Sequence, residues 1–82
     1  MENQKAPIAI ALTFTPQSSQ LAAFGYDAQT KTLEIWFKST GTTYHYFDVP
    51  PEVFDALKAA PSKGSYFIRN IKRAGFRYQR ID

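Results

Sequence analysis

Apolar and polar residues alternate along the centre of the chain, from residue 33 to residue 47. Two runs with a period of two flank a polar break at residues 39–42, which contains a glycine. Such a pattern predicts a β-hairpin. We expect a loop with an even number of residues, which collects the large apolar side chains on one face, because a shift of one residue turns every side chain over. The expected pairs are Phe37 with Tyr44 and Ile35 with Tyr46, beside Leu33, on one face, and Trp36 with His45 and Glu34 with Phe47 on the other.

Two further runs predict strands before the hairpin. Residues Ile8 to Phe14 alternate, and this strand either joins the edge of the same sheet, which we favour, or pairs with another chain. Residues Leu21 to Tyr26 form the next strand, which ends in a polar turn at residues 27–31. Apolar residues fall on both parities of that strand, so its inward face stays open. Gly25 marks either a bulge or a close contact.

Helical signals follow the hairpin. Pro50 and Pro51 favour a helix start, and Pro61 ends that helix. Ser62 is the expected N-cap of a second helix, which begins at Lys63 or Ser65, runs to Ala74 and stops at Gly75. The expected inward residues are Val53, Phe54, Leu57 and either Ala56 or Ala60 in the first helix, and Phe67, Ile68 and Ile71 in the second. Residues 76–81 form a last short strand or an extended tail.

These elements predict an α+β fold: an antiparallel β-meander of three to four strands followed by two short helices packed on one face. The 82 residues suffice for one domain, which we place at residues 18–82 behind an N-terminal extension at residues 1–17 that contains an extra strand. The chain has no cysteine, which fits a reducing, cytoplasmic location. The apolar run at residues 8–14 lacks the features of a secretory signal and is too short for a membrane span, so we expect no membrane contact.

Positive charge is concentrated in the last third of the chain. Residues 1–55 carry three bases and six acids, whereas residues 56–82 carry seven bases and one acid. This asymmetry suggests an anionic partner, although a solvated face is the ordinary alternative. Single-stranded RNA is bound by aromatic side chains together with arginine and lysine. The candidate RNA-binding residues are Tyr66, Arg69, Lys72 and Arg73 on one helix face, Arg77 and Arg80 extending it, and His45, which either stacks on a base or only covers Trp36.

The residue inventory argues against catalysis. One histidine, no cysteine and no glycine-rich phosphate loop leave Ser18 and Ser19 without an evident base. A zinc site built on His45 with Glu34 and Asp48 would have too few ligands. We therefore expect no enzyme activity, no cofactor and no metal. The competing hypotheses are docking of another protein through Trp36, His45 and the N-terminal strand, and homodimerisation through Ile8 to Phe14.

Several short motifs occur in a characteristic order. They are the serine pair at 18–19, GYD at 25–27, LEIWF at 33–37, YHY at 44–46, VP at 49–50 and SKGSYF at 62–67, before Ile71. This order resembles the KTSC domain, a family named for its occurrence at the C-terminus of some lysyl-tRNA synthetases, and the resemblance covers Ser18 to Phe76. Two positions depart from the family pattern: Ile68 stands where an Asn is frequent, and Phe76 where a Tyr is usual. The resemblance implies a small α+β fold and an RNA-binding role, without an established activity.

Overall fold

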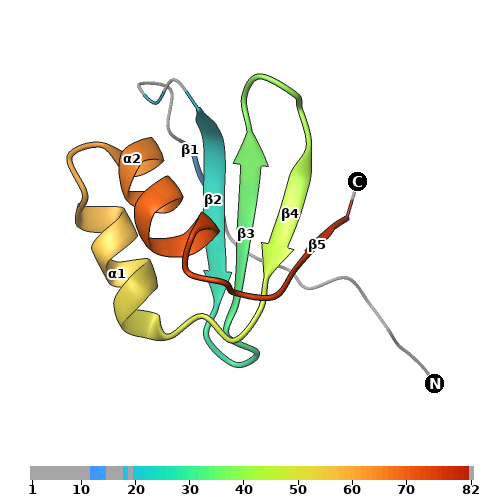
Figure 1. The fold of residues 1–82 in the computed structure, drawn as a ribbon, viewed down its shortest axis with the longest axis vertical. Helices are drawn as coiled ribbons and strands as arrows, with labels where there is room; N and C mark the ends of the chain where they lie inside the picture. The colour runs from blue at the N-terminus through green and yellow to red at the C-terminus, as the bar shows by residue number, and fades with distance from the viewer. Residues whose placement is uncertain (1–11, 15–17, 19, 82) are drawn as a thin grey trace.

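The computed structural model describes residues 12–14, 18 and 20–81, and in these ranges the chain forms an antiparallel sheet and a helical layer (Figure 1). The strand order is β1-β2-β3-β4-β5. The strands are β1 (Leu12–Phe14), β2 (Leu21–Asp27), β3 (Thr32–Phe37), β4 (Thr43–Tyr46) and β5 (Tyr78–Arg80). The helical segments are α1 (Pro51–Ala59), α2 (Lys63–Phe67) and the π-helical η1 (Ile68–Lys72), which continues α2. The predicted α+β meander with two helices is confirmed, and short edge strands bring the sheet to five.

Strand β1 pairs with β2, so the described part of the N-terminal strand belongs to this sheet. Residues 8–11 lie outside the described ranges. Homodimerisation through Ile8 to Phe14 therefore stays a hypothesis. Among the described residues, no helix combines the length and apolarity needed to cross a membrane.

A bulge in β2 explains why its apolar residues fall on both parities. Leu21 lies opposite Phe37, but Ala23 already lies opposite Trp36, so Ala22 is the extra residue. The bulge brings Leu21 and Phe24, three positions apart, to the same buried face. Of the two alternatives for Gly25, the bulge is excluded and the close contact is supported, since Gly25 pairs regularly with its neighbours and lies buried in the sheet.

The β3–β4 hairpin has the predicted faces but a different register. Its loop holds four residues, 38–41: the Phe37 amide donates to the Thr42 carbonyl at 2.9 Å, and the Gly41 amide donates to the Phe37 carbonyl at 3.0 Å. Gly41 has a φ of 68°, in the left-handed region that glycine adopts without steric cost. The loop occupies residues 38–41 instead of the predicted 39–42. Both ends of the loop therefore move by one position, and each residue of β3 pairs with a residue two positions earlier than expected. The observed pairs are Ile35 with Tyr44, Leu33 with Tyr46, Glu34 with His45 and Trp36 with Thr43.

The helices begin where the sequence predicts. Pro50 is the N-cap of α1, and the Ser62 hydroxyl accepts a hydrogen bond from the Ser65 amide at 3.3 Å at the start of α2. The second helix ends at Lys72 rather than Ala74. Its last residues widen into a π-turn, in which the Arg73 amide donates to the Ile68 carbonyl at 3.2 Å.

Aromatic rings join the second helix to the sheet. Phe67 is 1% exposed, and its ring centroid lies 5.5 Å from those of both Phe37 and Tyr46 in edge-to-face contacts. At the other end of the core, Tyr26 stacks on Phe54 and donates its hydroxyl to the Val49 carbonyl. The largest fully buried side chains are Phe24, Phe67, Leu21, Leu33, Ile35, Leu57, Ile71 and Val49.

The left-handed conformation of Gly41 allows a test of the hairpin loop. A Cβ added there would meet no heavy atom within 4 Å, so any cost of Gly41→Ala comes from the backbone. We expect Gly41→Ala to lower the free energy of unfolding by about 1–2 kcal/mol in urea denaturation. Gly41→Asn should lower the free energy of unfolding clearly less than Gly41→Ala does, because Asn tolerates this conformation. Equal losses for the two variants would contradict the backbone explanation.

Burial of Tyr46 predicts a loss of stability at high pH. Burial, followed by the neighbouring Tyr44 and Tyr78, raises the pKa of Tyr46 to about 12, compared with about 10 in the unfolded chain. The contribution of Tyr46 is therefore complete below pH 10 and is lost as the pH rises from 10 towards 12, with a slope approaching about 1.4 kcal/mol per pH unit. Urea titrations across this range should show a shallower decline for Tyr46→Phe than for the wild type. A wild-type slope in Tyr46→Phe would reject the assignment.

Candidate functional site

An open groove lies between η1 and the β4–β5 end of the sheet. The helices lie towards β2 and leave this end uncovered (Figure 1). The groove has a volume of about 480 Å³, which is within the range of roughly 300–1,000 Å³ typical of ligand pockets. The pairing of the strands and the turn of η1 decide which side chains enter it.

Tyrosines from the two last strands form the floor of the groove. Tyr46 pairs with Tyr78, and Tyr44 lies two residues before Tyr46, so alternation puts all three on the helix-bearing face. Their ring centroids are 5.6–6.3 Å apart, and Phe37 contacts Tyr44 edge-to-face at 5.5 Å. The Tyr46 hydroxyl is protonated near neutral pH, as any tyrosine with the ordinary pKa of about 10 is, and burial raises its pKa further, to about 12. The floor therefore offers aromatic faces together with hydroxyl groups.

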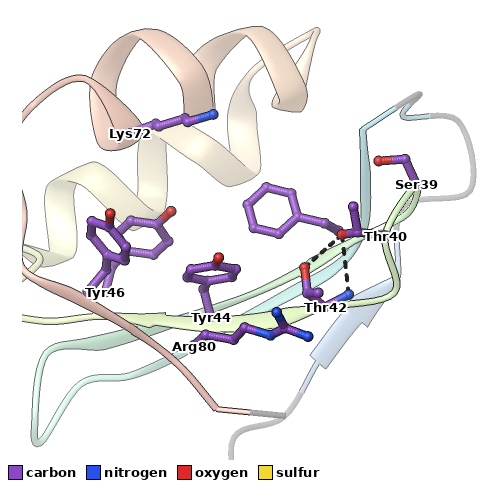
Figure 2. Close-up of a pocket in the computed structure, with 9 residues that line it drawn as sticks. Ser39, Thr40, Thr42, Tyr44, Tyr46, Lys72 and Arg80 are labelled. Carbon is purple, nitrogen blue, oxygen red and sulfur yellow. Dashed lines mark hydrogen bonds between the residues drawn. The ribbon is translucent and has the colours of Figure 1, made fainter.

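Two cations line the groove from different elements. Lys72 reaches over it from η1, while Tyr44 and Tyr46 rise from β4 with their hydroxyls towards the helix (Figure 2). Arg80, opposite Tyr44 on β5, extends along the sheet towards Thr42. The positive charges thus lie above and beside the aromatic floor.

The β3–β4 loop closes one end of the groove with hydroxyl groups. Ser39, Thr40 and Thr42 line this end. The Thr40 and Thr42 hydroxyls are hydrogen-bonded at 2.7 Å, and the Thr42 amide donates to the Thr40 hydroxyl at 3.4 Å. These groups can donate or accept hydrogen bonds.

The structure divides the candidate basic residues among three places. Lys72 and Arg80 line the groove. Arg69 and Arg73 are exposed on and just after η1, and line neither this groove nor the smaller hollow beside it. Arg77 lies over the Phe47 ring at 5.0 Å and is 3.8 Å from Asp48, an exposed pair that contributes little stability. Of the five basic candidates, Lys72 and Arg80 line the groove, and the basic helix face expected from the sequence stays a prediction.

The remaining two candidates do not enter the groove. Tyr66 is half-buried and packs against the core. His45 pairs with Glu34 on the opposite face of the sheet, with its Nε2 2.9 Å from the Glu34 carboxylate, and Glu34 also accepts from the Trp36 indole. Only 13% of the His45 side chain is exposed, which favours the structural explanation over base stacking. Protein docking through Trp36 and His45 stays a prediction.

Sequence reasoning missed Tyr78 and the loop hydroxyls. Tyr78 lies in a segment left open as a strand or a tail, and only its pairing with Tyr46 places it on the floor. The alternation of Tyr78 and Arg80 was the available signal. In the part of the chain that the structure describes, no group of three or more His, Cys, Asp or Glu side chains is placed to hold a metal ion.

Comparison with known proteins agrees with the motif order. The KTSC domain matches residues 17–76. An uncharacterized protein of Stutzerimonas stutzeri is 47% identical over 66 residues, which cover 80% of this chain and 92% of that protein. The lysine–tRNA ligase of Nostoc punctiforme is 42% identical over 66 residues, which are 80% of this chain but 11% of the ligase. The match is thus a small appendage of the ligase.

A crystal structure supports the same assignment. A KTSC domain protein from Yersinia pestis superposes with a TM-score of 0.82 at 32% identity, and the match covers 90% of this chain and all of that one. Sequence motifs, family match and fold agree, and the chain belongs to the KTSC domain family.

Proposed function

We propose that this domain binds single-stranded RNA in the tyrosine-floored groove. The observation that carries the proposal is the combination of Tyr44, Tyr46 and Tyr78 with Lys72 and Arg80 in one open groove. Bases stack on aromatic side chains, and cations neutralise the phosphates that connect them. A groove that holds aromatic rings and cations close together can bind the bases and the phosphates of the same RNA strand.

The same features favour unpaired RNA over a duplex. In an A-form helix the bases are stacked inside, and a protein reads mainly phosphates and 2′-hydroxyls across the minor groove. Tyrosine rings that form a floor are useful only for bases that have left the stack. The hydroxyls of Ser39, Thr40 and Thr42 at the closed end provide partners for ribose 2′-hydroxyls.

Two further observations support an RNA ligand. Lysine–tRNA ligases, which carry a homologous segment, act on an RNA by their name. Arg69 and Arg73 are exposed close to Lys72 in the chain, and the structure gives them no ion pair within residues 12–14, 18 and 20–81. They are available to follow the phosphate backbone beyond the groove.

Charge removal in the groove tests this function. We expect the wild type to bind a fluorescently labelled single-stranded oligoribonucleotide, with an affinity that falls as salt rises. Lys72→Gln should weaken binding and reduce the slope of log affinity against log salt by about 0.7, the value for one phosphate contact on a single strand. Fluorescence anisotropy at several salt concentrations measures both quantities.

Arg77 provides the matched control. It has the same charge as the groove residues but lies on the other side of the sheet, over Phe47. Arg77→Gln should therefore leave affinity and slope close to those of the wild type. Absence of salt-dependent binding by the wild type at low ionic strength would reject the function, and equal losses in Lys72→Gln and Arg77→Gln would reject the groove as its location.

A further inference from the structure

A second, smaller hollow adjoins the groove beneath the second helix. It has a volume of about 170 Å³ and shares Phe37, Ser39 and Lys72 with the groove. Its other lining residues are Gln20, Phe67 and Ile68. The shared residues form the boundary, so the two hollows make one continuous surface with two compartments.

The chemistry of the second hollow differs from that of the first. Phe67 and Ile68 give it apolar walls, and Gln20 adds an amide group. The helix fits closely around this amide: a Cβ built on Gly64 would lie 2.3 Å from the Gln20 Oε1 atom. Glycine at position 64 therefore leaves the space that the Gln20 side chain occupies.

A planar base suits such a hollow. Its ring can contact apolar walls, and its edge carries donors and acceptors that an amide can match with its own NH₂ and carbonyl. No cation other than the boundary Lys72 lines this hollow among the described residues. A phosphate is therefore favoured at the boundary rather than inside it.

We propose that the two hollows bind one dinucleotide step of single-stranded RNA. One base lies on the tyrosine floor, the next enters the hollow at Gln20, and Lys72 contacts the phosphodiester that joins them. This inference rests on the proposed RNA-binding function and specifies the ligand unit and the place of each base.

Calorimetric titrations with short adenosine ligands test the ligand unit. Adenosine 5′-monophosphate, the dinucleotide ApA and the trinucleotide ApApA are compared on the full chain. We expect ApA to bind about 5- to 150-fold more tightly than the mononucleotide, the range that one stacked base contributes. The mononucleotide carries at least as much negative charge as ApA, so charge alone cannot produce this order. The gain in affinity from ApA to ApApA should be smaller than the gain from the mononucleotide to ApA.

Variants locate the second base. Gln20→Leu keeps a branched side chain, one bond shorter than that of Gln20, but removes the amide, so it should weaken ApA and leave the mononucleotide little changed. Lys72→Gln should reduce the preference for ApA, because the joining phosphodiester loses its cation. Arg77→Gln, outside the groove, should preserve both affinities.

The outcomes separate this inference from the function on which it rests. If longer RNA binds but ApA binds no better than the mononucleotide, the two-compartment ligand is rejected while RNA binding stands. Equal weakening of both ligands by Gln20→Leu would also reject the two-compartment ligand and leave RNA binding in place. If no RNA of any length binds, both proposals fail.

Discussion

The packing of Phe67 between the sheet and the second helix holds the fold and the groove in a fixed relation. Its buried ring meets Phe37 from β3 and Tyr46 from β4 at the same centroid distance of 5.5 Å. Interiors are packed at nearly crystalline density, so a ring held on two sides leaves its helix little freedom to slide. Lys72 follows on the same helical run and lines both hollows. The position of this cation is thus set by a contact in the core.

The groove exists because the helices do not cover the whole face of the sheet. Two short helices pack against a five-stranded sheet, and β4 and β5 extend beyond them (Figure 1). Residues at that margin must tolerate both the core and water, and tyrosine does so because its ring is apolar while its hydroxyl is polar. Tyr46 is nearly buried and Tyr78 is 61% exposed, so the aromatic floor runs from the core outwards. The same side chains that complete the core therefore provide a surface for stacking.

Local pattern predicted much of the fold, and the misses have local geometric causes. Alternation placed Leu33, Ile35 and Tyr46 on one face, and the prolines and Ser62 marked the helix starts. Hairpin register depended on the φ of Gly41, and the inward face of β2 on a bulge at Ala22; neither conformation is visible in a period of two. The site was predicted less well for the same reason. The groove depends on the pairing of β4 with β5, which puts Tyr78 beside Tyr46 and Arg80 beside Tyr44, and alternation within one segment does not show that pairing.

The side chain at position 68 lies in the wall of the smaller hollow. Ile68 is half-buried and forms part of the apolar wall of this hollow. The amide group that lines the hollow comes from Gln20. An Asn at this position would bring a second amide to the same wall and remove apolar contact. The tyrosine floor lies on different elements and would not change with it. A change at position 68 therefore alters the wall of the smaller hollow and leaves the tyrosine floor of the groove in place.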